Sequence, residues 1–354
     1  MPIDFKPGFL ATGIGSLPHL DPRVAVDDVL ARLPEMPYWP QLPAMGPSED
    51  MGLQYAAPLM PLVAADPAGR RVIPNPELSR EEALAAFYEK LFAGDLAGFG
   101  LGPADAAGFG LYLAKVAAMP AGTPPYLKGH VTGPLTMAAS IKGRDGKAFL
   151  YDDEVAEAVA RGLGLAAAAQ VAQMNHLARP MMIFLDEPFL DGYGSAFTPI
   201  SRARVVELLG FTLEEARNHA PDTVYGIHCC GNTDWSMLVD AGADVVNLDS
   251  AGYGEHLLLY PEALKALFDR GGAVAWGAVP TSQFSGRETA EGLWEHLRGL
   301  LAGLEAKGLS RERLASQALV TPACGMGSLT PEKARRILEL TAGVSELARR
   351  EYGR

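Results

Sequence analysis

The chain of 354 residues is 48% hydrophobic and only 20% charged, so it has ample apolar material for a large core and is unlike a disordered protein. Its formal net charge of −12 excludes the basic surface typical of proteins that bind nucleic acid or anionic membranes. The N-terminal sequence MPIDFKPGFL has no secretory-signal pattern, no stretch approaches the ~18 uninterrupted apolar residues of a membrane helix, and three cysteines are too few for a disulfide framework. We therefore expect a cytoplasmic protein with neither nucleic acid nor membrane as a partner.

Short apolar runs alternate with long helical patterns along the chain. The runs that predict strands are Phe9–Ile14, Tyr126–Val131, Met181–Leu185, Thr223–Ile227, Val245–Leu248, Ala273–Trp276 and Ala318–Val320. The patterns that predict helices are Pro22–Ala31, Arg80–Leu91, Asp153–Leu177, Ser201–His219, Trp235–Ala241, Pro261–Phe268, Glu288–Lys307 and Pro331–Glu351. The strand runs lack polar alternation, which indicates burial on both faces, as in a parallel sheet. The repeated alternation predicts a single (β/α)₈ TIM barrel over residues 1–354, with a doubly wound sheet as the alternative.

The segment Pro40–Pro76 interrupts this alternation. Helix-breaking residues recur through it, so it is expected to be largely irregular. Irregular segments of this length inside a compact fold are often lids or binding loops. We therefore expect a functional loop in this part of the chain.

The clearest chemical signal is the apolar run that ends in His228, Cys229 and Cys230 and breaks at Gly231. Alternate residues of a strand share a face, so His228 and Cys230 point to one side and Cys229 to the other. An imidazole and a thiolate on one face form half of a zinc site. The alternative is a buried strand end whose cysteine side chains only pack.

The third cysteine, Cys324, follows another predicted strand near the end of the chain. All three cysteines thus fall at the carboxyl ends of predicted strands, which in a barrel form the face where active sites are built. We predict that His228, Cys230 and Cys324 supply three zinc ligands and leave a position for an exchangeable group. The alternative for Cys324 is a chance thiol in a loop that enters a helix.

Carboxylates follow two further predicted strands. Asp249 follows one of them and is a candidate for a fourth, displaceable zinc ligand or for a hydrogen-bond partner of His228. The alternative is that it caps the N-terminus of a helix. Asp186 and Glu187 come directly after five apolar residues. Such a pair can hold a ligand amine, and the alternative is an acidic turn before the proline that follows.

The first predicted strand leads into the small turn IGSLPH, which contains Gly15 and Ser16. Free backbone N–H groups and a hydroxyl can bind a carboxylate. The turn is not a phosphate loop, because neither GxxxxGK[ST] nor GxGxxG is present. A plain glycine turn is the alternative. Lys128 and His130, near the next predicted strand, either face the same site or lie in its rim.

The ordered motifs IGSLPH, GHVTGP, LDEP, HCCGN with DVVNLD, and TPACGMG span about residues 8–345. Together they resemble the C-terminal catalytic domain of cobalamin-independent methionine synthase, in a superfamily with uroporphyrinogen decarboxylase and the methylcobamide:coenzyme M methyltransferases. The resemblance implies a (β/α)₈ barrel and an enzyme that transfers a methyl group to a small thiol, homocysteine, to give methionine.

The resemblance implies a Zn²⁺ ion that activates this thiol. By this resemblance, His228, Cys230 and Cys324 are the metal ligands and therefore the catalytic residues. Asp249 occupies the place of a fourth ligand, which is glutamate in methionine synthase. Because aspartate is one methylene shorter, direct ligation by Asp249 is an open question.

The resemblance also implies how the amino acid is held. By this resemblance, Gly15 and Ser16 bind the carboxylate of the substrate, and Asp186 binds its amino group. Glu49, in an early loop, matches a further acidic contact. Holding both ends of the substrate fixes its sulfur near the methyl donor, and zinc keeps that sulfur in the reactive thiolate form.

The methyl donor is expected to be a methylated corrinoid, free or on a partner protein, with methyltetrahydrofolate second. Full methionine synthase has an N-terminal half that helps bind folylpolyglutamate and has no counterpart here, and an acidic chain is a poor host for a polyglutamate tail. Coenzyme M is an alternative acceptor. The alternative functions are a metal-free enzyme like uroporphyrinogen decarboxylase and a non-catalytic zinc or corrinoid carrier.

Overall fold

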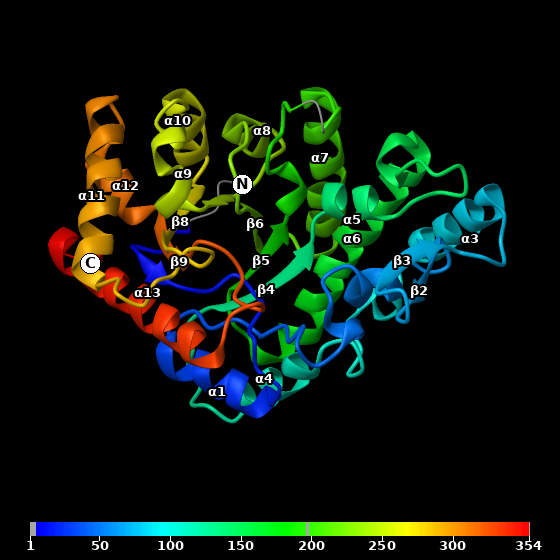
Figure 1. The fold of residues 1–354 in the computed structure, drawn as a ribbon, viewed down its shortest axis with the longest axis horizontal. Helices are drawn as coiled ribbons and strands as arrows, with labels where there is room; N and C mark the ends of the chain where they lie inside the picture. Colours follow the sequence, from blue (N-terminus) through cyan, green and yellow to red (C-terminus); the bar gives the residue numbers. More distant parts are fainter. Residues whose placement is uncertain (1–4, 196–197, 354) are drawn as a thin grey trace.

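The computed structural model of the protein describes residues 5–195 and 198–353. Within these ranges, seven parallel strands form one curled sheet (Figure 1). Their order across the sheet is β1 (Leu10–Ala11), β9 (Ala318–Pro322), β8 (Ala273–Val279), β7 (Val245–Leu248), β6 (Val224–Cys229), β5 (Met181–Asp186) and β4 (Leu127–Thr132). Each predicted strand is present, although the first shortens to two residues because only these two pair with β9 in regular register.

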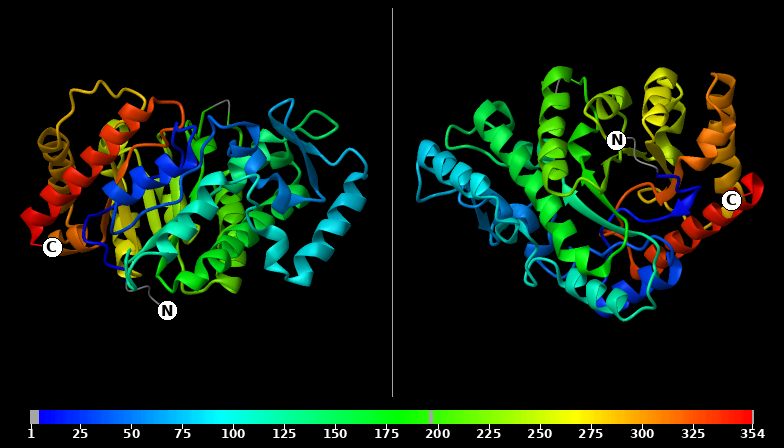
Figure 2. Two further views of the ribbon diagram at one scale, coloured as in Figure 1. Left: turned by 90° about the horizontal axis from the view of Figure 1, so that it is seen from below. Right: turned by 180° about the vertical axis from the view of Figure 1, so that it is seen from behind.

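Helices surround the sheet on its outer side (Figures 1 and 2). They are α1 (Pro22–Arg32), α2 (Ala56–Leu59), α3 (Arg80–Ala93), α4 (Ala107–Ala117), α5 (Pro134–Ser140), α6 (Asp153–Met174), α7 (Arg202–His219), α8 (Trp235–Asp240), α9 (Ser250–Leu257), α10 (Pro261–Asp269), α11 (Ala290–Ala306), α12 (Arg311–Ser316) and α13 (Pro331–Tyr352). The predicted helices are confirmed, and α2, α4, α5, α9 and α12 are additional. Residues of α4 lie in a glycine- and alanine-rich stretch that carries little helical pattern.

The sheet closes through an extended segment, residues 37–41, that lies between its two edge strands. On one side the backbone N–H of Lys128 in β4 donates to the carbonyl of Pro37 over 3.1 Å. On the other side the N–H of Gln41 donates to the carbonyl of Gly15 over 3.1 Å. This segment fills the eighth strand position, so the fold is a (β/α)₈ barrel.

The sequence did not reveal this eighth strand. Pro37 and Pro40 lack a backbone N–H and interrupt the apolar run, so the segment resembles a loop. The stretch Pro40–Pro76, expected to be irregular, also contains an antiparallel hairpin of β2 (Val63–Asp66) and β3 (Arg71–Pro74). This hairpin and α3 project from one side of the barrel (Figures 1 and 2).

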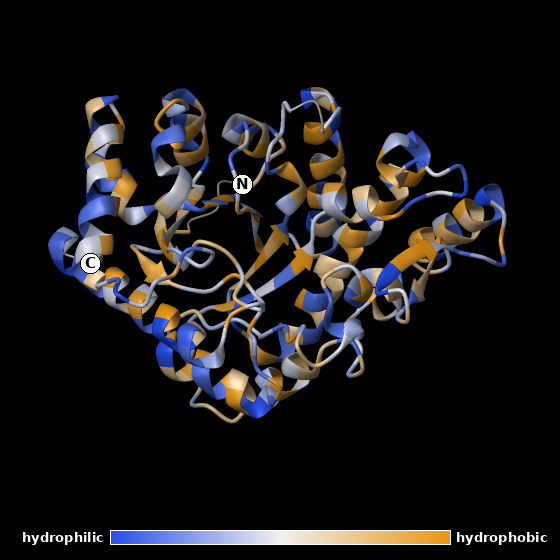
Figure 3. Ribbon diagram, viewed as in Figure 1, coloured by the Kyte–Doolittle hydropathy of each residue, from blue (hydrophilic) through white to orange (hydrophobic). Residues whose placement is uncertain are grey.

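The barrel strands consist mostly of apolar residues, as the hydropathy colouring shows (Figure 3), and both of their faces are buried. Alternate side chains fill the barrel interior, and they include Leu10, Ile14, Met182, Phe184, Val224, Val245, Ala275 and Leu319. The intervening side chains pack against the surrounding helices in a second core that contains Leu185, Ile227 and Cys229. The strand sequences therefore read as continuous apolar runs because each strand is buried on both sides.

One helical stretch among the described residues, Asp153–Leu177, has the length and apolar composition of a membrane span. Of its most apolar window, 78% is buried inside the fold. The same composition is typical of a core helix. Here α6 packs between the barrel and its neighbouring helices.

Gln170 of α6 ties this helix to the barrel wall. Its side-chain oxygen accepts a hydrogen bond from the indole N–H of Trp39 at 2.8 Å and from the backbone N–H of His130 at 3.2 Å. Its amide nitrogen donates to the carbonyl of His130 at 2.9 Å. All of these groups are buried, so Gln170 pairs polar atoms that would otherwise lack partners.

The substitution Gln170→Leu keeps the side-chain size but removes the bonds to Trp39 and His130. Because two buried N–H groups lose their acceptor, we expect the free energy of unfolding to fall by about 2–4 kcal/mol. Urea denaturation followed by circular dichroism measures the loss. The matched control is Gln173→Leu on the same helix, which loses bonds to the half-buried backbone of Leu101 and should cost less. Equal losses in the two variants would contradict this role of Gln170.

Candidate active site

Three side chains from two distant segments of the sequence meet at the carboxyl ends of the strands. His228 lies near the end of β6, Cys230 follows it, and Cys324 follows β9. One ligand atom from each of them lies within 4.8 Å of the other two. The arrangement expected from strand alternation is therefore present, with two sulfurs and one imidazole nitrogen facing the same point.

The imidazole of His228 is fixed by a chain of hydrogen bonds. Its Nδ1 lies 2.5 Å from Oδ1 of Asn247 in β7. The amide nitrogen of Asn247 in turn donates to the carbonyl of Ala275 and to the hydroxyl of Thr321, so its oxygen must face the histidine. Nδ1 therefore carries the proton. Nε2 presents its lone pair toward the sulfurs, and it is buried without a hydrogen-bond partner.

The two thiols of the cluster form a hydrogen-bonded pair. The Cys324 thiol donates to Cys230, and this bond, helped by His228, lowers the pKa of Cys230 to about 4 despite burial. The same bond and burial raise the pKa of Cys324. Cys229 faces the opposite way and is fully buried, and burial raises the pKa of its thiol. Cys229 therefore stays a neutral packing side chain.

The cluster forms one wall of a cavity of about 150 Å³ inside the mouth of the barrel. The polar residues around this cavity are Ser16, Gln41, His130, Thr132, Asp186, His228, Cys230 and Cys324. Ile14, Met51 and Pro188 supply apolar wall. A cavity of this size suits a small molecule of a few heavy atoms with several polar groups.

The turn that contains Ser16 packs directly on the turn that carries Cys324. The backbone N–H of Gly327 donates to Ser16 Oγ over 3.2 Å. A Cβ atom at Gly325 would lie 2.3 Å from the same oxygen, so only glycine allows this approach. Because Ser16 Oγ accepts this bond, its own proton is free to donate into the cavity.

The two neighbouring carboxylates after β5 have different surroundings. Asp186 lines the cavity, and its Oδ1 is buried without a partner. Burial raises the pKa of Asp186 to about 6. Glu187 instead points away and accepts hydrogen bonds from the backbone N–H groups of Leu135 and Thr136, both at 2.8 Å. The pair therefore does not act as a unit: only Asp186 faces a ligand.

Lys128 lies in the barrel interior below the cavity. It is fully buried, its Nζ donates to the carbonyl of Ile14 over 2.6 Å, and it sits 4.2 Å from the ring centre of Phe184. Burial lowers the pKa of Lys128 to about 7, and the nearby carboxylate of Asp186 opposes this shift. The sequence left open whether Lys128 and His130 face the site or lie in its rim. In the structure His130 lines the cavity and Lys128 lies beneath it.

Asp249 and Glu49 lie near the site but are occupied by other bonds. Asp249 caps α9, with Oδ1 accepting from the N–H of Gly252 over 2.8 Å, and it does not join the group of His228, Cys230 and Cys324. Both oxygens of Glu49 accept backbone N–H bonds, from Leu42 at 3.0 Å and from Ala107 at 2.6 Å. Glu49 therefore fixes the surrounding loops, and it is not among the residues around the cavity.

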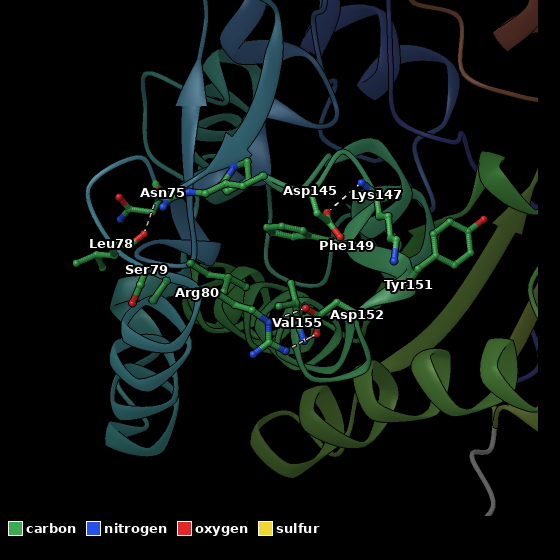
Figure 4. Close-up of a pocket in the computed structure, with 16 residues that line it drawn as sticks. Asn75, Leu78, Ser79, Arg80, Asp145, Lys147, Phe149, Tyr151, Asp152 and Val155 are labelled. Carbon is green, nitrogen blue, oxygen red and sulfur yellow. Dashed lines mark hydrogen bonds and ion pairs between the residues drawn. The ribbon is translucent and has the colours of Figure 1, made fainter.

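A larger hollow of about 470 Å³ lies outside the barrel mouth, among the β2–β3 hairpin, the start of α3 and the loop before α6 (Figure 4). Its arginines are already paired. Arg80 binds the carboxylate of Asp152 at 2.6 Å, and Arg144 binds three backbone carbonyls of the facing loop. It contains none of the histidine or cysteine side chains. The chemistry therefore belongs to the smaller cavity.

Comparison with known proteins identifies the family of the chain. The sequence model of one family, described as the catalytic domain of cobalamin-independent synthase, matches residues 109–346, which is more than half of the chain. The match contains His228, Cys230 and Cys324 but begins after the Ser16 turn. No curated protein matches the chain in sequence. A B12-independent methionine synthase from Shewanella sp. W3-18-1, solved in complex with selenomethionine, is similar with 19% identity and a TM-score of 0.48, over 68% of this chain and 67% of that chain.

The two carboxylates after β5 are expected to respond differently to substitution. Glu187→Ala leaves two buried backbone donors of α5 without an acceptor, so the free energy of unfolding should fall by about 2–4 kcal/mol. Asp186→Asn removes a buried charge that has an unpaired oxygen, so it should change stability by less than about 1 kcal/mol. Urea denaturation of both variants tests this, and a loss in Asp186→Asn as large as in Glu187→Ala would contradict it.

Proposed function

Because the chain belongs to the family of cobalamin-independent methionine synthase catalytic domains, which are methyltransferases, we propose that it is a zinc-dependent enzyme that methylates the thiol of homocysteine. The observation that carries the proposal is the cluster of His228, Cys230 and Cys324 beside a small polar cavity. Two thiols and an imidazole are the ligands that zinc prefers. The cavity beside them is where a substrate thiol would take the fourth position.

The residues present fit a zinc ion. Nε2 of His228 is buried with no hydrogen-bond partner, so a cation is the natural partner for its lone pair. Asn247 holds the other ring nitrogen, as residues behind metal-bound histidines commonly do. The low pKa of Cys230 makes this ligand available as a thiolate. We propose these three side chains as the ligands, with Asp249 as a nearby negative charge that caps its helix.

Bound zinc would supply one piece of chemistry, which is to keep a substrate thiol in its nucleophilic thiolate form at neutral pH. The protein does the rest by positioning. The hydroxyl of Ser16, next to Gly15 in the chain, lies on one side of the cavity, and the carboxylate of Asp186 lies on another. We propose that the first pair binds the carboxylate of homocysteine and that Asp186 binds its ammonium group. Holding both ends of the substrate leaves its sulfur directed at the metal ligands.

Asp186 suits this role because it is buried, acceptor-only when ionised, and without a partner of its own. Its pKa of about 6 lets it ionise at neutral pH. An arriving ammonium group favours the ionised form further. Glu49, the other acidic residue expected to contact the substrate, is engaged by two backbone N–H groups, so we propose that it holds the loop that borders the cavity.

The family description bears on the methyl donor. Members are defined by their independence of cobalamin, so the methylated corrinoid expected from the sequence is not supported. We therefore propose methyltetrahydrofolate as the donor. The thiolate would attack its methyl group in line, the sulfur–methyl bond forming as the nitrogen–methyl bond breaks, and the nitrogen of the departing tetrahydrofolate would take up a proton.

Metal analysis tests the proposed ligands. The purified protein should contain about one zinc per chain, because the three side chains form one site with an open position. Cys230→Ser and Cys324→Ser should each lose most of this zinc, since a hydroxyl is a poor replacement for a thiolate. The measurement is elemental analysis after exhaustive dialysis.

Cys229→Ser is the matched control for the metal ligands. Its thiol is adjacent in sequence but faces the helix-side core, so this variant should keep its zinc even if its stability falls. Equal zinc loss in Cys229→Ser and Cys230→Ser, or a zinc-free wild-type protein, would overturn the proposed metal site.

Turnover tests the substrates. The zinc-loaded enzyme should form methionine from homocysteine and methyltetrahydrofolate, with little or no product from methylcobalamin. Asp186→Asn should lower kcat/KM for homocysteine by about 10- to 100-fold, because a hydrogen-bonded charge pair is worth about 1.5–3 kcal/mol. Thiol binding without methionine formation from either donor would favour a carrier over an enzyme. Faster turnover with methylcobalamin would overturn the proposed donor.

A further inference from the structure

His130, in the middle of β4, lines the cavity but has no part in the chemistry proposed above. Its side chain is only 2% exposed, and both ring nitrogens are buried without a hydrogen-bond partner. Buried polar atoms without partners destabilise a fold, and in native proteins they often mark places where a ligand completes the bonding. An imidazole with two free nitrogens at a cavity wall is therefore a candidate for ligand recognition.

The ring of His130 is held in place from several sides. The indole of Trp39 stacks on it, with ring centres 4.0 Å apart and planes 21° from parallel. The carbonyl of His130 accepts bonds from the hydroxyl of Tyr55 and from the amide of Gln170. Gln170 also accepts from the indole N–H of Trp39, so the stacking partner is fixed as well. The ring is thus preorganised toward the cavity.

Gly15 provides the space that the ring occupies. A Cβ atom at this position would lie 2.9 Å from Nδ1 and 3.0 Å from Nε2 of His130, so any larger residue would displace the imidazole. The ring therefore lies against the same turn, Gly15 and Ser16, that we propose for the substrate carboxylate. Ser16 and His130 offer donors on this side of the cavity, and the acceptor Asp186 comes from the neighbouring strand.

We infer that His130 donates a ring N–H to the carboxylate of the thiol substrate, and that it selects amino-acid thiols over thiols without a carboxylate. The inference rests on the proposed function and adds a specificity residue to it. Burial, together with the charge of Lys128, holds the pKa of His130 well below its usual value. The neutral ring then offers one donor to the carboxylate without placing a second cation in the interior.

The test compares two thiols that differ only in the carboxylate. Homocysteine and 3-aminopropane-1-thiol are titrated into the zinc-loaded protein by calorimetry, which measures binding without turnover. His130→Phe keeps the flat ring that stacks on Trp39 but removes both nitrogens. It should weaken homocysteine binding by about 10- to 100-fold and leave the affinity for the aminothiol unchanged. His256→Phe, at an exposed histidine, is the matched control and should change neither affinity.

Each outcome decides one of the two proposals. If the wild-type protein binds neither thiol, the proposed function fails. The role of His130 fails, while the proposed function stands, if the wild-type protein binds homocysteine and His130→Phe binds it equally well. The same holds if His130→Phe has an equally reduced affinity for both thiols.

A measurement on the wild-type protein replaces the variant if His130→Phe does not fold. The ¹⁵N resonances of the His130 ring should shift when homocysteine binds and stay in place when the aminothiol binds. Unchanged resonances with homocysteine would overturn the assignment.

Discussion

The structure depends on one constraint: a polar atom buried in the barrel interior destabilises the fold unless it has a hydrogen-bonding or ionic partner. Most buried polar groups near the barrel mouth obey it: Gln170 pairs with Trp39, and Asn247 pairs with Thr321. Among the buried polar atoms without a partner, Nε2 of His228, Oδ1 of Asp186 and both ring nitrogens of His130 border the same 150 Å³ cavity. Four unpaired polar atoms thus gather where a metal ion and a small charged substrate would pair them, which is why we place the function there.

Closure of the barrel brings these groups together. Residues 37–41 bond to β4 on one side and to the Gly15 backbone, which follows β1, on the other. This one segment therefore joins the two edges of the sheet. Trp39 in this segment stacks on His130, and Gly15 leaves room for the ring. The carboxylate side of the cavity therefore depends on the eighth strand position. The side of the proposed metal ligands depends instead on β6, β7 and β9; β6 and β7 are neighbours in the sheet, and β8 lies between β7 and β9.

Burial gives the ionisable groups of the site their separate roles. It raises the pKa of Asp186 to about 6 and lowers the pKa of Lys128 to about 7, so both pKa values lie close to neutral pH. Cys230 is the opposite case, because the hydrogen bond from Cys324 and the nearby His228 outweigh its burial and favour the thiolate. The same strand end also separates two adjacent carboxylates: Asp186 faces the cavity, and Glu187 holds the start of α5.

The sequence by itself determined the barrel class and the grouping of His228, Cys230 and Cys324. Apolar runs without alternation predict parallel strands, the carboxyl ends of such strands share one face, and the period of two along a strand separates Cys229 from His228 and Cys230. Tertiary structure alone decided the eighth strand, because the prolines in residues 37–41 hide it and its pairing partners are distant in sequence. It also decided that Glu187, Glu49 and Asp249 bind backbone N–H groups, and that His130 faces the cavity. A sequence shows which side chains follow a strand, but the atoms they meet are set by contacts between segments far apart in the chain.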